Sequence, residues 1–213
     1  MLLYQSVGPN PRVVTMYLAE TGMKVRRRFV DIMKGENRQA DYLARNPVGH
    51  TPALELDDGT VIAESLPICE YLDETNGPTD LIGRDAQIRA RTRMMTRFVD
   101  QQVVVPMTIG FRGAEGLPMF KDRVACFPPA SDSMKEQARY GLSKLEDLIG
   151  DGAFLCGDRF SLADIVLFAF TDFGTQVGQP LPGDNAKLTA WHDRVAARDS
   201  AAISADPHNG SDS

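Results

Sequence analysis

The sequence contains little cysteine. Only three of its 213 residues are cysteines, and they form no C-x-x-C pair: Cys69, Cys126 and Cys156. An odd number of scattered thiols argues against a disulfide framework, and the missing pair argues against a zinc site or a dithiol redox centre. We therefore expect a chain without a structural metal, working in a reducing compartment such as the cytoplasm.

Long apolar runs and an excess of positive charge are also missing. No stretch approaches the length of a membrane-spanning helix, and the N-terminus lacks the basic and apolar regions of a signal peptide. Twenty-nine acidic residues against 23 basic ones give a net charge of -6. This balance argues against nucleic acid or an anionic membrane as a partner, and we expect the basic groups at 26–28 and 84–97 to be solvated surface.

The composition is that of a folded globular chain. Hydrophobic residues make up 43% and charged residues 24%, with 18 glycines and 13 prolines spread along the sequence. The length suffices for one large domain or two small ones, each with a substantial core.

The first third of the sequence alternates between strand and helix patterns. A helix between the first two strands implies a parallel crossover, and a tight Asp-Gly turn later implies an antiparallel hairpin, so we expect a mixed sheet. In chain order the patterns predict a strand (2–6), a loop of turn formers (8–11), a helix (12–22), a strand (25–32), a weak helix (37–45), a hairpin (53–56 and 60–63) and a helix with Ser65 as its N-cap (65–76).

Beyond Gly77-Pro78 the apolar spacing is helical wherever it is periodic. We expect a long helix kinked or ended by Pro106, and further helices over 142–149, 163–177 and 186–198. Residues 111–133 show no clean period. The predicted organisation is an α/β domain over residues 1–78, an all-helical domain over 85–203 and a flexible tail over 204–213.

Three short motifs give this order of elements a family resemblance. Thr51-Pro52 precedes the hairpin, Glu64-Ser65 follows it, and residues 160–164 read Phe-Ser-Leu-Ala-Asp. At this spacing the chain resembles the cytosolic glutathione transferases over residues 1–200. The resemblance implies a thioredoxin-like N-terminal domain that binds glutathione and an all-α C-terminal domain that shapes the pocket for a second substrate. It also implies a homodimer, and an enzyme that directs the glutathione thiol at small apolar electrophiles, as in detoxification.

The resemblance also assigns the glutathione site residue by residue. It implies a cis bond at Thr51-Pro52, with the main chain of Thr51 pairing with the cysteinyl part of glutathione. Ser65, at a helix N-terminus, would hold the γ-glutamyl carboxylate, Glu64 its ammonium group, and His50 the glycyl carboxylate. The plainer alternatives are a trans Thr-Pro bond at an edge strand, an ordinary N-cap, a surface acid and a solvent-facing histidine.

The residue that activates the thiol is less obvious, because the family usually presents Tyr, Ser or Cys after the first strand. Here residues 6–12 read Ser-Val-Gly-Pro-Asn-Pro-Arg. A free thiol has a pKa near 8.5, and lowering it by about two units corresponds to about 2.7 kcal/mol. Asn10, nearest the helix start, is the favoured donor over Ser6, and backbone amides of the loop are a third candidate. Tyr4, inside the strand, is expected to be core.

Other motifs are expected to serve structure. Ser161 and Asp164 form a capping box, and Trp191 is expected in the core. Five apolar residues are available for the second-substrate pocket, although helical stripes of this kind usually form core: Met94, Phe98, Met107, Phe111 and Phe120. Two other functions stay open: a glutathione or apolar-ligand binding protein without turnover, and a glutathione-dependent peroxidase or disulfide reductase.

Overall fold

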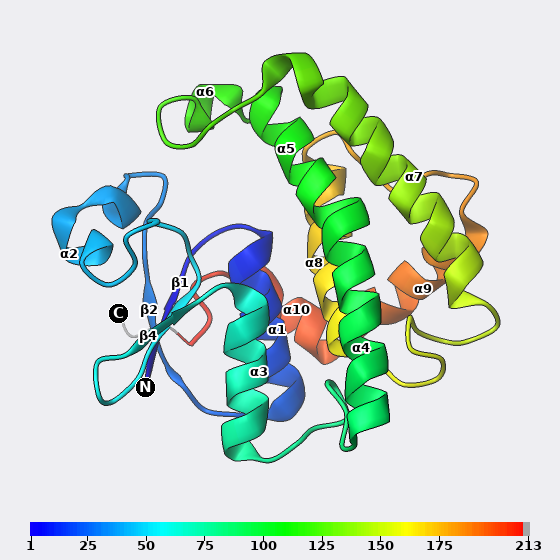
Figure 1. The fold of residues 1–213 in the computed structure, drawn as a ribbon, viewed down its shortest axis with the longest axis horizontal. Helices are drawn as coiled ribbons and strands as arrows, with labels where there is room; N and C mark the ends of the chain where they lie inside the picture. The colour runs from blue at the N-terminus through cyan, green and yellow to red at the C-terminus, as the bar shows by residue number, and fades with distance from the viewer. Residues whose placement is uncertain (211–213) are drawn as a thin grey trace. The chain divides into compact units, whose positions relative to one another are not determined.

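The computed structural model describes residues 1–210 and divides the chain into two compact units. The first contains residues 1–79 together with residues 196–210, and the second contains residues 80–195. Figure 1 shows the sheet in the first unit and the long helices of the second.

The first unit is built on a four-stranded mixed sheet, as the sequence predicts. Its order is β2-β1-β3-β4. β1 is parallel to β2 and antiparallel to β3, and β3 and β4 form an antiparallel hairpin. The strands are β1 (Leu2–Gln5), β2 (Arg26–Phe29), β3 (Ala53–Glu55) and β4 (Val61–Ala63).

The two faces of the sheet are covered by different helices. One face carries Tyr4 and Ala53, which pack with Val30 and Tyr42 in a buried cluster. Tyr42 comes from the segment formed by η1 (Glu36–Arg38) and α2 (Ala40–Leu43). Because strand side chains alternate, neighbouring residues such as Leu3, also fully buried, face the opposite side. There α1 (Pro9–Thr21) and α3 (Ser65–Asn76) pack on each other.

The end of the chain belongs to the first unit. Helix α10 (Asp199–Ala205) packs on α1, and the side chain of Gln5 donates a 2.8 Å hydrogen bond to the carbonyl of Pro207. The sequence analysis groups residues up to 203 with the helical domain and treats 204–213 as a tail, of which residues 211–213 lie outside the described part of the chain. The structure differs because α10 is only seven residues long and buries small residues, a pattern too short and too polar to give a helical period.

A bidentate ion pair fastens α10 to α1. Arg198 donates from Nε and Nη2 to the two carboxylate oxygens of Glu20, each at 2.7 Å, and the Ser200 hydroxyl donates to the same carboxylate. Burial raises the pKa of Glu20, but the donors and the charge of Arg198 outweigh it and hold this pKa below its usual value. A carboxyl with a lowered folded-state pKa stabilises the fold above its unfolded-state pKa and loses that contribution as the pH falls.

We expect Glu20→Gln to lower the free energy of unfolding by about 1–3 kcal/mol at neutral pH, because two charge-assisted bonds are lost. The difference from wild type should shrink as the pH falls from about 4.3, the ordinary pKa of a glutamate, through the lowered folded-state pKa of Glu20, below which the wild-type carboxyl is also protonated. Urea unfolding at several pH values measures both effects. Glu136→Gln, on the exposed side of α7 (Ser131–Ile149), is the control and should change stability by less than about 0.5 kcal/mol.

The regular elements of the second unit are helices, as predicted, and two isolated β-bridges lie in the turn segment at 154–159. Helix α8 is its centre, because nearly every residue from Leu162 to Thr171 is buried. Helix α4 packs on α8, and α5 packs on α7. Pro106 does not break the first helix abruptly: a π-helical turn, η2 (Asp100–Val104), joins α4 to α5, and the proline lies in the first turn of α5. The remaining elements are α4 (Ala86–Val99), α5 (Val105–Gly113), α6 (Leu117–Phe120), η3 (Pro128–Ala130), α8 (Leu162–Gln176) and α9 (Ala186–Ala196).

The predicted capping box is present at the start of α8. The Ser161 side chain interacts with the third helical residue, Asp164, and the Asp164 carboxylate accepts from the Ser161 backbone. Trp191 is completely buried, as expected.

Two further observations concern the described part of the chain, residues 1–210. None of its helices combines the length and apolarity needed to cross a membrane. Within the same residues, no group of three or more histidine, cysteine or acidic side chains is arranged to hold a metal ion.

Candidate functional site

The N-terminal ends of α1 and α3 meet through two of the predicted site residues. The Ser65 hydroxyl donates a 3.3 Å hydrogen bond to Oδ1 of Asn10. Ser65 is the first residue of α3 and Asn10 the second of α1, so the positive ends of two helix dipoles come together at this contact. The arrangement is suited to an anion.

The start of α1 differs from the sequence analysis, which treats residues 8–11 as a loop and begins the helix at Arg12. The structure begins the helix at Pro9, after Gly8 with φ 109°. The two prolines are tolerated because the first amides of a helix have no intrahelical partner. Among the first three helical residues only Asn10 has an amide hydrogen, so within the first turn of α1 the side-chain and backbone candidates are the same residue, while the amides of Val7 and Gly8 precede the helix.

Ser6 makes a different hydrogen bond. It is only 3% exposed, and its hydroxyl donates a 2.6 Å hydrogen bond to the carbonyl of Val30. The bond ties the end of β1 to the segment after β2. Since a hydroxyl has one hydrogen, this contact occupies Ser6 as a donor.

The hairpin brings the other predicted residues to one edge. Ala53 pairs with Ala63, so Thr51, two residues before one strand, lies at the same end of the hairpin as Glu64, which follows the other. The Thr51-Pro52 bond is cis, as the resemblance implies, and Pro52 is buried while Thr51 is half-buried. The register therefore places Thr51 and Glu64 near the Asn10–Ser65 contact.

Glu64 adopts a backbone conformation that is rare for its residue type, with φ 70° and ψ 133°. Such conformations cost roughly 1–3 kcal/mol and concentrate at ligand-binding positions. Glu64, rather than the predicted Ser65, is the N-cap of α3, and its side chain makes no capping bond. The Ser65 hydroxyl is directed to Asn10 instead, so neither residue caps the first amides of α3 with its side chain.

His50 precedes this edge with a half-buried side chain. Its carbonyl accepts hydrogen bonds from Tyr42 and Asn46, at 2.7 and 2.9 Å. The sequence analysis did not single out either donor. In the sequence, the only local pattern at these two donors is Asn46-Pro47, which indicates the end of a helix.

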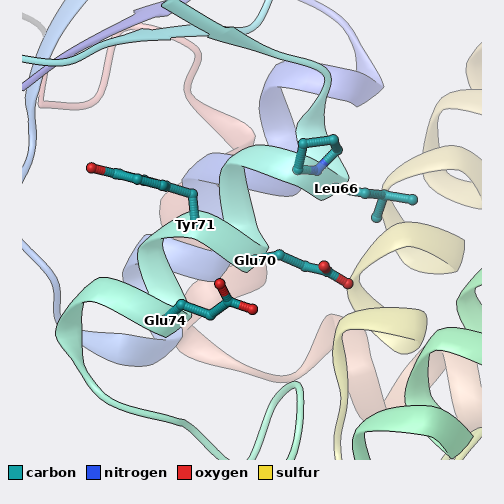
Figure 2. A pocket seen from close by; sticks show the side chains of 5 residues that line it. Leu66, Glu70, Tyr71 and Glu74 are labelled. Carbon is teal, nitrogen blue, oxygen red and sulfur yellow. The ribbon is translucent and has the colours of Figure 1, made fainter. Parts of the chain in front are cut away.

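A depression of about 400 Å³ lies along α3, beyond Ser65. Figure 2 shows Leu66 and Glu70 extending to one side of the helix and Tyr71 to the other. Glu70 and Glu74 make its lining acidic, with no basic side chain from α3. A ligand with two carboxylates is therefore disfavoured in this depression, in contrast to the helix ends at Asn10 and Ser65.

The five apolar candidates in the helical unit divide by burial. Met107 is 1% exposed and belongs to the core, whereas Met94 is 63% exposed. Phe98 is half-buried. Phe111 contacts Phe120 edge-on, with ring centroids 5.9 Å apart. Phe111 makes a similar contact with Phe173 of α8, with ring centroids 5.1 Å apart. The sequence analysis did not single out Phe173.

Comparison with known proteins identifies one family for both parts of the chain. The family model described as glutathione S-transferase, N-terminal domain, matches residues 7–75, and that of the C-terminal domain matches residues 123–199. Among curated proteins, glutathione S-transferase 2 of Saccharomyces cerevisiae is 31% identical over 94% of this chain and 87% of its own length. Maleylacetoacetate isomerase of Pseudomonas aeruginosa is 32% identical over 72% of this chain and 71% of its own length.

Solved structures give the same result. The crystal structure of Gtt2 from Saccharomyces cerevisiae superposes with a TM-score of 0.88 at 30% identity, covering 96% of this chain and all of the other. A glutathione S-transferase domain-containing protein of Marinobacter aquaeolei VT8 superposes with a TM-score of 0.85 at 36% identity, covering 94% and 99%. With both halves of the fold matched in sequence and in structure, the chain belongs to the glutathione S-transferase family.

Proposed function

We propose that this chain is a glutathione transferase that activates the thiol of glutathione for attack on small apolar electrophiles. The observation that carries the proposal is the Asn10–Ser65 contact, 3.3 Å long, in which the Asn10 side-chain oxygen accepts from Ser65 at the N-terminal end of α3. A ligand with a carboxylate at one end and a thiol in the middle can bind both: its carboxylate at the N-terminus of α3 and its thiol at the Asn10 amide.

In this proposal, glutathione lies along the edge formed by Thr51 and Glu64. Its γ-glutamyl carboxylate accepts from the uncapped amides at the start of α3, at Ser65. The exposed carboxylate of Glu64 faces the ammonium group, and the main chain of Thr51 pairs with the cysteinyl residue. His50 is proposed to reach the glycyl carboxylate.

Asn10 is proposed to stabilise the thiolate. Because its Oδ1 accepts from Ser65, the other half of the amide, the donor Nδ2, points away from that contact. A donor and a helix N-terminus aimed at sulfur both favour the charged form and lower the thiol pKa. The proton leaves to solvent, and the thiolate then attacks the electrophile: a carbon–sulfur bond forms, and with an aryl halide the carbon–halogen bond breaks and halide leaves.

We propose that the helical unit binds the electrophile, with the aromatic contacts of Phe111 and Phe120 as its apolar surface. The reaction itself must be measured, because one relative carries the name of an isomerase. Peroxidase or disulfide reductase activity uses the same thiolate, and a binding protein would retain glutathione without turnover.

Calorimetric titration of glutathione into the folded protein tests the binding step. Conjugation of an aryl halide and reduction of a hydroperoxide test the chemistry, and the more active substrate assigns the reaction class. Binding without turnover in either assay would favour the binding protein, and no heat of binding would overturn the proposed function.

We propose further that the enzyme is a cytoplasmic homodimer. The family resemblance supports the dimer. The three cysteines are free thiols, which suits a reducing compartment. Sedimentation equilibrium gives the oligomeric state, and fractionation of the source cell gives the compartment.

A further inference from the structure

Three successive carbonyls before the proposed glutathione site point at one segment of the chain. These are the carbonyls of residues 48, 49 and 50, and their donors all come from residues 36–46, which contain η1, α2 and the turn after them and are called the η1–α2 segment below. The bonds are Arg38 Nη1 to Val48 O (3.2 Å), Asn37 Nδ2 to Gly49 O (2.7 Å), and Tyr42 OH and Asn46 Nδ2 to His50 O (2.7 and 2.9 Å).

The closeness of the two segments requires glycine at one position. Gly49 has φ 70°, and a Cβ there would lie 2.9 Å from Nη1 of Arg38 and 3.0 Å from the carbonyl of Asn37. No larger residue fits without moving one of the segments. The loop is therefore held against the η1–α2 segment by packing as well as by hydrogen bonds.

The carbonyl of His50 is the most firmly held of the three. It accepts from both Tyr42 and Asn46, so both of its lone pairs are used. The two donors are 5% and 4% exposed, and water competes little for these bonds. Burial raises the pKa of Tyr42 to about 12, which leaves the phenol protonated at neutral pH.

The held carbonyl fixes the direction of the next amide. The only cis bond among residues 1–210 is Thr51-Pro52, so the peptide between His50 and Thr51 is trans. In a trans peptide the C=O and N–H point in opposite directions within one plane. With the carbonyl directed at Tyr42 and Asn46, the amide of Thr51 is directed away from the η1–α2 segment.

We propose that Tyr42 and Asn46 are positioning residues, which hold the His50–Thr51 peptide in the orientation that glutathione binds. The inference rests on the proposed function, since Thr51 is there the main-chain partner of the cysteinyl group. Neither residue touches the ligand. Each acts through the His50 carbonyl, and together they set the direction of the Thr51 amide before the ligand arrives.

The test compares Tyr42→Phe, Asn46→Ala and the double variant with wild type by calorimetric titration of glutathione. Tyr42→Phe removes only the hydroxyl and keeps the ring packed edge-on against Tyr4, so it is expected to fold. Each single change should raise the Kd for glutathione about fivefold, the effect of about one lost hydrogen bond. In the double variant the rise in Kd should exceed about 25-fold, the product of the two single effects, because the His50 carbonyl then loses both of these donors together.

Tyr17→Phe is the matched control. It also removes a buried tyrosine hydroxyl from the first unit, one that donates a 3.2 Å hydrogen bond to Asp73 between α1 and α3. It should lower the urea midpoint as much as Tyr42→Phe does, while leaving the Kd for glutathione unchanged. In turnover assays, Tyr42→Phe should raise the KM for glutathione and leave kcat at saturating glutathione and the KM for the electrophile unchanged.

The outcomes separate the inference from the function on which it rests. If wild type shows no heat of binding, the proposed function fails and the inference falls with it. If wild type binds and both folded single variants bind equally well, only the inference is overturned. If Tyr17→Phe raises the Kd as much as Tyr42→Phe does, the rise reflects a general loss of stability. That result would also overturn the inference.

Discussion

Replacement of Asn10 by alanine is expected to lower kcat/KM for glutathione conjugation by about 10- to 100-fold. The change removes the side-chain donor that the Ser65 contact orients, and with it about 1.4–2.7 kcal/mol of thiolate stabilisation, equivalent to one to two pKa units. The pKa of the bound thiol should rise toward about 8.5, the value of a free thiol. The ultraviolet absorbance of the thiolate, titrated against pH in the complex, measures it directly.

The pH dependence of the rate shows the direction in which Asn10→Ala changes the thiol pKa. Rate follows the thiolate fraction, so the wild-type profile should rise with pH and level off above a lowered thiol pKa. The Asn10→Ala profile should be displaced to higher pH and approach wild type in alkaline solution, where both thiols are ionised. An unchanged profile would remove Asn10 from the mechanism.

Ser6→Ala is the comparison for this experiment, because Ser6 was the other side-chain candidate. Its hydroxyl is bonded to the Val30 carbonyl in the interior, so the variant should lose about 1–3 kcal/mol of stability and keep the wild-type pH profile. A displaced profile for Ser6→Ala, with none for Asn10→Ala, would reverse the assignment.

Substitution of Asp164 by alanine is expected to give the largest loss of stability, about 3–5 kcal/mol. The carboxylate is completely buried in the helical unit. It accepts four hydrogen bonds: from the Leu155 amide (2.9 Å), the Ser161 amide and hydroxyl (2.9 and 2.7 Å) and Trp191 Nε1 (2.9 Å). Burial raises the pKa of Asp164, opposed by these donors. Alanine leaves all four donors unsatisfied in the interior.

Trp191 is the only tryptophan of the chain, so its fluorescence follows unfolding at this network. Asp164→Asn keeps the shape but turns an amide group toward donors, and should lose about 2–4 kcal/mol. Asp132→Asn, exposed in the first turn of α7, is the control and should stay within about 0.5 kcal/mol of wild type. Equal midpoints for Asp164→Asn and Asp132→Asn would contradict this account of the network.

Local signals were sufficient for most elements of the fold. The Asp-Gly turn predicted the hairpin of β3 and β4, and the helical spacing after Gly77 predicted an all-helical second unit. Short elements without a period were missed. Helix α10 is the clearest case, because its stability comes from packing on α1 and from the Glu20–Arg198 pair, neither of which leaves a local pattern.

The candidate site was predictable in part. The motif at Thr51-Pro52 and the pair Glu64-Ser65 predicted a ligand site, and the hairpin register brings these residues to one end of the hairpin. Asn10 was chosen by its position near a helix start. Two other features depend on contacts between separate elements. The Ser6 hydroxyl donates to the Val30 carbonyl, and Tyr42 and Asn46 donate to the His50 carbonyl.

By itself the sequence determined the order of elements, the mixed sheet and the family, because turn residues, apolar periods and short motifs act over a few residues. The tertiary structure alone decided which donors converge. It joined Ser65 to Asn10 across 55 positions of sequence and directed the carbonyl of His50 into the η1–α2 segment. Hydrogen bonds depend on distance and angle in space, and two residues far apart in the chain acquire these only when the helices and strands between them are packed.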